Sequence, residues 1–224
     1  MRARGRDHGE MAAGEWSSAE HALSYLSRAD TLPHRTEGEG VLLEQVPKDA
    51  RRVLDLGTGD GRLLALLRHD RPEVSGVGLD VSKPMLEKAH ERFRDDRASR
   101  SSSKHDLAEA LPALCGFDAI VSSFAIHHLE HERKRSLYGE VFDVFEPGGV
   151  FCNLERVASP TERLHRRFYD ALGYEPGWED RSNRLLDVET QLGWLRELGL
   201  EDGDCYWKWL EMALIVAIKP AAWR

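Results

Sequence analysis

A short apolar run turns through three glycines into a helical pattern in the segment VLDLGTGDGRLLAL, residues 53–66. In open α/β sheets, the turn between the first strand and its helix approaches the ligand most closely. Glycine removes side chains from such a turn, so a ligand can lie against backbone N–H groups. The segment therefore predicts an α/β domain that binds a ligand at this turn, although three glycines can also serve only to make a tight loop.

The rest of the chain alternates between strand-like and helical patterns, which is typical of a doubly wound, mostly parallel sheet. Strands are predicted at 53–57, 75–80, 117–124 and 150–157, with a further one in the polar stretch 97–106. Helices are predicted at 18–26, 37–46, 60–68, 84–94, 131–145 and 188–198, with Ser82 as a cap and a PGG turn at 147–149. The runs GDCYWKW and MALIVAIKP, 203–209 and 212–220, are separated by a tight link, which joins antiparallel neighbours.

These patterns indicate one domain over residues 51–219 of the 224-residue chain. Residues 1–50 are interpreted as a flexible N-terminus followed by a helical lid. Residues 158–187 are interpreted as an insertion that forms a helical cap over the strand ends. The insertion mixes arginines with aromatic residues, which fits an acceptor site, a cover for the core or a dimer face; these residues are Arg163, Arg166, Arg167, Phe168, Tyr169, Tyr174 and Trp178.

The formal net charge of −8 disfavours nucleic acid and anionic membranes as partners. No apolar run of 18 residues occurs, and the basic N-terminus is not followed by an apolar stretch, so we expect neither secretion nor a membrane span. Cys115, Cys152 and Cys205 are widely spaced and have no metal-binding pattern, as expected of reduced thiols in a cytoplasmic protein. We expect no metal site.

The glycine spacing distinguishes between ligand classes. A dinucleotide fingerprint requires a third glycine where this chain has Arg62. The acid Asp55 instead stands two residues before the first glycine, where it would repel a pyrophosphate and attract an ammonium or sulfonium. Asp80 ends the next strand at the distance from which an acid binds ribose hydroxyls. A nucleoside joined to an amino acid fits both acids.

Several ordered motifs, taken together, resemble those of the class I S-adenosylmethionine-dependent methyltransferases. VLDLGTGDG resembles the first motif of that family, VGLD the second, KHDLAEALP the adenine-contacting segment, and FDAIVSSFAIHHL with FEPGGVF the fourth-strand region. The resemblance covers about residues 51–219. It implies a Rossmann-like, seven-stranded sheet whose last strand is inserted antiparallel, and methyl transfer from S-adenosyl-L-methionine to a small-molecule acceptor through an oxygen or nitrogen nucleophile.

The resemblance also implies roles for individual residues. The methionine portion would lie against Asp55 and the turn Gly57, Thr58, Gly59 and Gly61; the ribose against Asp80; the adenine against Val81, Met85, Asp106 and Leu107; and the sulfonium against Ser122, Ser123 and Phe124. Each has a structural alternative, such as a core methionine, a helix cap or a strand end.

Three further residues are candidates. His127 and His128 could act as a general base. Alternatively, packing could hold them, and no base would be needed, because methyl transfer from an activated sulfonium requires little beyond positioning. Arg35 could pair with the cofactor carboxylate if the N-terminal helices form a lid, or could be an exposed loop arginine.

Other functions stay open at this point. The SSFAIHHL region is shared with the carboxymethyl-cofactor enzymes of tRNA wobble modification, which would need a further basic anchor. A non-catalytic cofactor-binding protein is a second alternative, and a homodimer is possible. An NAD oxidoreductase is disfavoured by Arg62.

Overall fold

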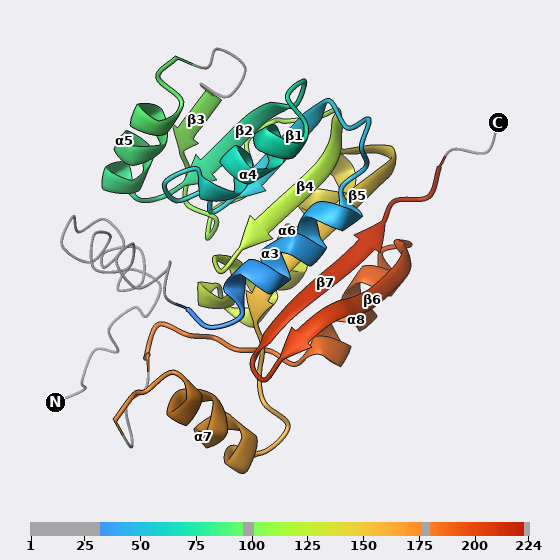
Figure 1. Ribbon diagram of the computed structural model, residues 1–224. Helices are drawn as coiled ribbons and strands as arrows, with labels where there is room; N and C mark the ends of the chain where they lie inside the picture. Colours follow the sequence, from blue (N-terminus) through green and yellow to red (C-terminus); the bar gives the residue numbers. More distant parts are fainter. Residues whose placement is uncertain (1–31, 96–100, 176–179, 222–224) are drawn as a thin grey trace, which may run out of the picture.

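A single seven-stranded sheet organises the chain in a computed structural model that describes residues 32–95, 101–175 and 180–221. The strand order is β3-β2-β1-β4-β5-β7-β6 (Figure 1). The strands are β1 (Arg52–Leu56), β2 (Ser75–Asp80), β3 (Ser101–Lys104), β4 (Phe117–Ser123), β5 (Phe145–Arg156), β6 (Glu201–Trp209) and β7 (Met212–Ile218). The direction of winding reverses between β1 and β4, which is where open α/β sheets bind ligands.

The five strands from β1 to β5 are parallel, whereas β7 runs antiparallel to both β5 and β6. The predicted seven-stranded, mostly parallel sheet with an inserted antiparallel strand is therefore confirmed. Only Leu210 and Glu211 separate β6 from β7, which is the tight connection that antiparallel neighbours allow.

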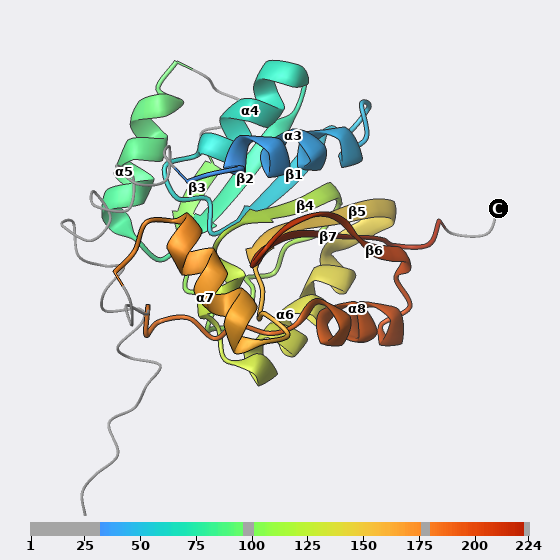
Figure 2. The same cartoon turned by 60° about the horizontal axis from the view of Figure 1, so that its bottom comes forward.

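Helices cover both faces of the sheet (Figure 2). They are α3 (Arg35–Gln45), α4 (Arg62–Asp70), α5 (Lys83–Arg92), the short 3-10 helix η2 (Ile126–His128), α6 (His131–Val144), α7 (Glu162–Ala171) and α8 (Val188–Glu197). One apolar core joins α3 and α4 to the sheet, and the other joins α6 and α8 to the opposite face. The helix α7 lies beyond the end of β5 (Figure 1), and its Phe168 and Tyr169 join the first of these cores. None of the helices within the described ranges is long and apolar enough to cross a membrane.

The helix α3 packs directly on the sheet. A Cβ added at Gly38 would come within 2.8 Å of Leu154 on β5 and 2.9 Å of Trp207 on β6, so glycine permits the close approach. The predicted helix at 18–26 lies outside the described residues. A lid function for the N-terminal segment stays a prediction.

Three local expectations were wrong in detail. The helix predicted from residue 37 begins at Arg35, so this arginine lies on α3 and not in a loop. The predicted PGG turn lies within β5, where the pairing with β4 shifts register between Phe117 and Ala119. Ser82 occupies the N-cap position of α5, but its side chain makes no capping hydrogen bond.

Candidate functional site

A cavity of about 300 Å³ lies at the carboxyl ends of β1, β2 and β4. Most of the predicted site residues line it: Arg35, Asp55, Gly57, Thr58, Gly59, Asp80, Val81, Met85, Asp106, Leu107, Ser123, Phe124 and His128. Residues that were not predicted also contribute, namely Asp60, Arg62, Leu63, Ala108, Ala125, Leu129, Glu130, Arg133 and Arg184. The fold thus brings residues from position 35 to position 184 to one site.

Three predicted residues do not line the cavity. Ser122 is fully buried, and its hydroxyl donates a hydrogen bond to the carbonyl of Leu56 at 2.8 Å, which links β4 to β1. Gly61 precedes α4 with φ 78°, and a Cβ there would lie 2.6 Å from the ring of Phe93. His127 is 5% exposed. All three residues are therefore buried outside the cavity lining.

The glycine turn has two different faces. Gly57 has φ 73°, and a Cβ at this position would lie 2.1 Å from the Cβ of Ala125, so the turn after β1 packs against the turn after β4. Gly59 has φ 55°, but a Cβ there would meet no protein atom within 4 Å. Because Gly59 also lines the cavity, its bare side is open to a ligand.

Asp55 presents an unsatisfied carboxylate oxygen beside this turn. The hydroxyl of Thr58 donates to Oδ2 at 2.7 Å, whereas Oδ1 is buried and has no hydrogen-bond partner among the described residues. Burial raises the pKa of Asp55 to about 7, and the nearby charges of Asp80 and Asp60 act in the same direction. A cationic donor would satisfy Oδ1 and favour the ionised carboxylate.

Asp80 connects the end of β2 to the glycine turn. Its Oδ2 accepts the backbone N–H of Gly59 at 2.8 Å, and its Oδ1 accepts the N–H of Ser82 at 2.8 Å. Burial raises the pKa of Asp80, while these two hydrogen bonds oppose the shift. Each carboxylate oxygen can accept a further hydrogen bond, so Asp80 can bind a ligand hydroxyl while it holds the turn.

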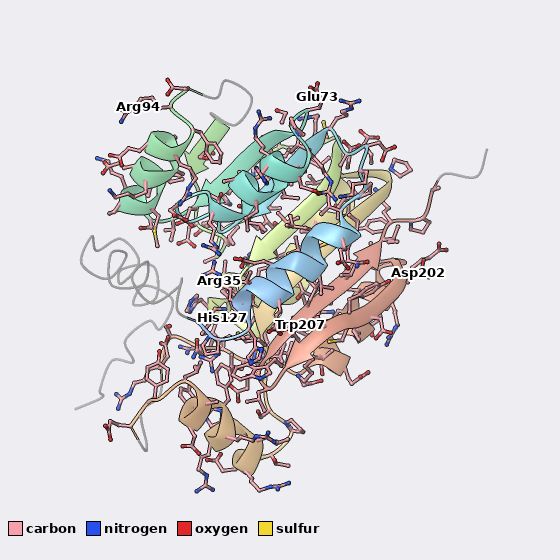
Figure 3. The ribbon with its side chains drawn as sticks, in the orientation of Figure 1. Arg35, Glu73, Arg94, His127, Asp202 and Trp207 are labelled. Carbon is pink, nitrogen blue, oxygen red and sulfur yellow. The ribbon has the colours of Figure 1, made fainter. Side chains whose placement is uncertain are left out.

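Two arginines that line the cavity, Arg35 and Arg62, both pair with the buried Glu39. Arg35 Nε donates to Glu39 at 2.8 Å, and Arg62 contacts the two oxygens of Glu39, with Nε and Nη2 each at 3.0 Å. The guanidinium of Arg35 lies 5.5 Å from the ring centre of Phe124. Figure 3 shows Arg35 at the N-terminal end of α3. Arg35 is 7% exposed, so the exposed-loop interpretation is wrong.

Arg133 on α6 holds the loop that follows β3. Its guanidinium donates to the carbonyls of Leu107 and Glu109 at 2.7 and 2.8 Å. It also pairs with Glu140, which accepts the N–H of Leu111 at 2.9 Å. This pair of side chains fixes the loop that carries two of the predicted adenine contacts.

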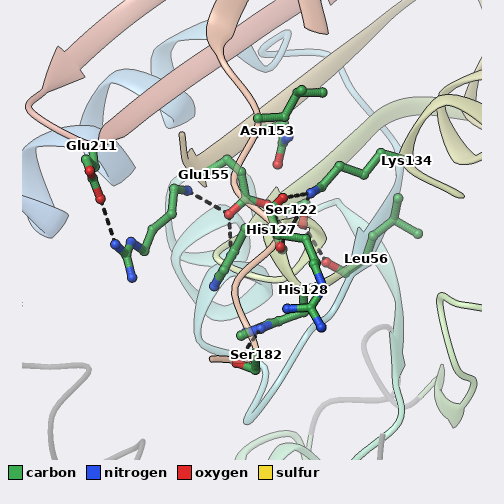
Figure 4. Close-up of polar contacts among 12 residues, drawn as sticks. Leu56, Ser122, His127, His128, Lys134, Asn153, Glu155, Ser182 and Glu211 are labelled. Carbon is green, nitrogen blue, oxygen red and sulfur yellow. Dashed lines mark hydrogen bonds and ion pairs between the residues drawn. The ribbon is translucent and has the colours of Figure 1, made fainter. Parts of the chain in front are cut away.

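The adjacent histidines have different environments (Figure 4). His127 is buried, with Nδ1 2.5 Å from Glu155 Oε1 and its backbone N–H donating to Oε2 at 2.7 Å. Burial lowers the pKa of His127 well below its usual value and raises that of Glu155 to about 7. His128 lines the cavity and lies 3.9 Å from His127 between ring centres. Of the two, only His128 is placed to meet a ligand.

Among its described residues, the insertion reaches the cavity through Arg184, and not through its aromatic residues. The backbone N–H of Arg184 donates to the carbonyl of His127 at 2.8 Å, and its side chain pairs with Glu130 at 2.8 Å. Lys134 contacts the carbonyls of His127 and Arg184. None of the described residues among the predicted arginine and aromatic set of the insertion lines the cavity, and Trp178 lies outside the described residues.

The helix α7 is attached to the sheet by buried contacts. Glu211, which is fully buried, accepts from Arg156 at 2.7 Å and contacts His165 Nδ1 at 2.6 Å. The rings of Phe168 and Trp209 lie 5.9 Å apart between centres, edge to face. Phe168 and Tyr169 belong to the buried core, which agrees with the alternative that they cover it.

Some of the unpredicted residues had a signal in the sequence. Glu39 stands four residues after Arg35, the spacing of a helical ion pair. Glu155 is an acidic residue that follows the strand-like run VFCNL, and an acid buried in a strand requires a partner. Arg133 has no local signal, because the carbonyls of Leu107 and Glu109 to which it donates lie more than twenty positions earlier in the sequence.

Comparisons with known proteins place these features in a family context. A family model described as a methyltransferase domain matches residues 53–149, which contain the glycine turn, Asp80 and both histidines. A carboxy-S-adenosyl-L-methionine synthase of Desulfotalea psychrophila is 26% identical over 199 residues, and the alignment covers 80% of each chain. A trans-aconitate 2-methyltransferase of Variovorax paradoxus is 32% identical over 166 residues, covering 71% of this chain and 60% of that protein.

The fold also resembles solved structures. The structure of human N-acetylserotonin methyltransferase in complex with S-adenosylmethionine superposes with a TM-score of 0.70. At 15% identity, the match covers 96% of this chain and 61% of that one.

Proposed function

We propose that the chain is a class I S-adenosylmethionine-dependent methyltransferase that methylates an oxygen or nitrogen atom of a small molecule. One observation carries the proposal: Asp55, Gly59 and Asp80 converge on a single cavity at the switch point of the sheet. The volume of about 300 Å³ and the net charge of −8 favour a small-molecule acceptor over a nucleic acid. A homodimer and a cytoplasmic location stay predictions.

The residues present fit S-adenosylmethionine. The unsatisfied Oδ1 of Asp55 suits its ammonium group, the open side of Gly59 leaves room for it, and Asp80 retains acceptor capacity for ribose hydroxyls. When bound, the cofactor supplies a methyl group activated by its sulfonium. The chain would bind adenine and the sulfonium end with the predicted residues that line the cavity: Val81, Met85, Asp106, Leu107, Ser123 and Phe124. Their work is to orient the reactants and exclude water.

A direct assay tests the function. The full chain is incubated with S-adenosylmethionine labelled in its methyl group and with a deproteinised cell extract. Transfer of label to a small molecule, with formation of S-adenosylhomocysteine, is expected. Binding of S-adenosylhomocysteine without any transfer would instead indicate a non-catalytic cofactor-binding protein.

A second candidate is a transferase or synthase that uses carboxy-S-adenosylmethionine. It is favoured by the relative from Desulfotalea psychrophila, whose alignment covers 80% of both chains. The additional carboxylate would need a cation, and Arg35 and Arg62 both line the cavity. Mass spectrometry of the ligand that co-purifies with the chain distinguishes the two cofactors.

Substituting Arg35 by alanine is expected to weaken binding of S-adenosylhomocysteine and to lower thermal stability. The arginine is buried, pairs with Glu39 and lies over Phe124, so its removal costs packing as well as a cation for the ligand carboxylate. Calorimetry and thermal unfolding measure the two effects. Arg163→Ala, on the exposed side of α7, is the matched control. Wild-type affinity in a folded Arg35→Ala variant would assign Arg35 to structure alone.

Affinity for S-adenosylhomocysteine is expected to rise with pH through the pKa of Asp55, which burial raises to about 7. The ionised carboxylate attracts the ligand ammonium, and its population grows between about pH 6 and about pH 8. Conversely, without ligand the ionisation of Asp55 costs stability as pH rises from its unfolded value of 3.8 through about 7. Calorimetry across this range, with Asp55→Asn as the comparison, measures the slope. An equal slope in Asp55→Asn would contradict the assignment.

A further inference from the structure

Asp180, Ser182 and His128 form a row of polar groups that ends at the cavity. Ser182 Oγ lies 3.0 Å from His128 Nδ1 and 2.7 Å from Asp180 Oδ1. The backbone N–H of Ser182 donates to the same oxygen of Asp180 at 3.0 Å. Two of these residues come from the insertion, and the histidine comes from η2, more than fifty positions earlier. Figure 4 shows Ser182 directed toward the ring of His128.

The direction of the hydrogen bonds follows from the charge of Asp180. Burial opposes its ionisation, but the hydroxyl and the backbone N–H of Ser182 hold the pKa of this carboxyl below its usual value. An ionised carboxylate only accepts hydrogen bonds, so Ser182 gives its single hydroxyl proton to Asp180. The oxygen of Ser182 must then accept from His128, which places the ring proton on Nδ1. The other nitrogen, Nε2, carries the lone pair.

The surrounding structure holds the ring in this position. The backbone of η2 is attached to Glu155 through the N–H of His127 and to the insertion through the N–H of Arg184. Burial, together with the neighbouring His127, lowers the pKa of His128 to about 3, so its ring is neutral at physiological pH. A neutral ring with a fixed Nδ1–H is a proton acceptor at Nε2.

We propose that Asp180 and Ser182 are positioning residues that hold His128 as the Nδ1–H tautomer, so that Nε2 accepts the proton of a hydroxyl on the methyl acceptor. This inference rests on the proposed function. The hydroxyl oxygen bonds to the methyl carbon as the carbon–sulfur bond breaks, and the sulfonium becomes a neutral thioether. The hydroxyl proton moves to Nε2, and the imidazolium is stabilised by Asp180 through Ser182.

Among the possible nucleophiles of the methyl acceptor, a hydroxyl is the one that needs a base. A carboxylate has no proton to lose, and a neutral amine attacks through its lone pair without a base. A hydroxyl oxygen that is gaining a methyl group becomes strongly acidic, so even a weakly basic imidazole takes its proton. The acceptor class that uses this arrangement is therefore an alcohol, phenol or enol.

Nitrogen NMR tests whether Asp180 and Ser182 position His128. The full chain is labelled with ¹⁵N at histidine and saturated with S-adenosylhomocysteine. The long-range correlation pattern of His128 is expected to show Nδ1 protonated and Nε2 unprotonated. Ser182→Ala should change this pattern, whereas Ser136→Ala on the exposed side of α6 should not. A wild-type ring protonated on Nε2, or a pattern unchanged in Ser182→Ala, would overturn the proposal.

A product measurement tests the acceptor class. With S-adenosylmethionine carrying a ¹³C methyl group, the carbon shift of the methylated product from the cell extract identifies the atom to which it is bound. A methyl ether supports the hydroxyl assignment, and a methyl ester, N-methyl or C-methyl product refutes it. If no product forms, the proposed function fails, and the tautomer measurement still decides whether Ser182 and Asp180 position His128.

Discussion

Substituting Gly59 by valine is expected to abolish measurable binding of S-adenosylhomocysteine. A Cβ at this position would meet no protein atom within 4 Å and would project into the space that the cavity offers a ligand. The φ of 55° also strains a β-branched residue, at a cost of about 1–3 kcal/mol. Calorimetry measures the affinity, and thermal unfolding measures the strain.

Gly199 provides the matched control for this substitution. It has φ 86°, is exposed, and a Cβ there would also meet nothing within 4 Å. Gly199→Val should therefore lose similar stability through strain and keep wild-type affinity. A folded Gly59→Val variant that binds S-adenosylhomocysteine as the wild type does would show that the ligand lies elsewhere.

Substituting Asp80 by alanine is expected to reduce affinity for S-adenosylhomocysteine by at least about tenfold. Each hydrogen bond from a ribose hydroxyl to the carboxylate is worth about 1.5–3 kcal/mol, and 1.4 kcal/mol corresponds to a factor of ten. The variant also loses the two backbone hydrogen bonds that connect Asp80 to Gly59 and Ser82, so the turn itself loosens. Both effects act in the same direction, and calorimetry records their sum.

A substitution of Asp118 is the control that distinguishes a loss of ligand affinity from a general loss of stability. Its Oδ2 accepts the backbone N–H groups of Arg51 and Arg52 at 2.7 and 2.9 Å, and it does not line the cavity. Asp118→Ala removes the same number of backbone contacts and should leave affinity unchanged. Equal losses of affinity in the two variants would mean that Asp80 acts only through folding.

Local patterns in the sequence were sufficient to predict the strands and the part of the cavity that surrounds the glycine turn. The glycine turn and Asp80 stand at the ends of strands whose apolar pattern is continuous, and carboxyl ends of parallel strands meet at one edge. The antiparallel pairing of the last two strands was predicted because the link between them is too short for a parallel crossover. These predictions depended on neighbours within a few residues, where spacing carries the information.

The part of the cavity around His128 depended on contacts that spacing does not reveal. Ser182 reaches His128, and Arg133 reaches Leu107, across long stretches of chain. The different environments of His127 and His128 also could not be predicted from their adjacent positions, because His127 is paired with a glutamate on β5. Arg35 was predicted at the site, but its place on α3 was not, because the polar connector before it obscured the start of the helix.

The position of β7 between β5 and β6 determines when the edge of β5 can be paired during translation. The strands that form the cavity, β1, β2 and β4, all precede it, whereas β5 is left with an open edge until β6 and β7 have both been made. An unpaired edge of a buried, apolar strand is a template for pairing with other chains. We expect β6 and β7 to dock as one hairpin, because β6 makes no pairing with β5. The hairpin that covers the edge of β5 thus contributes none of the described residues that line the cavity.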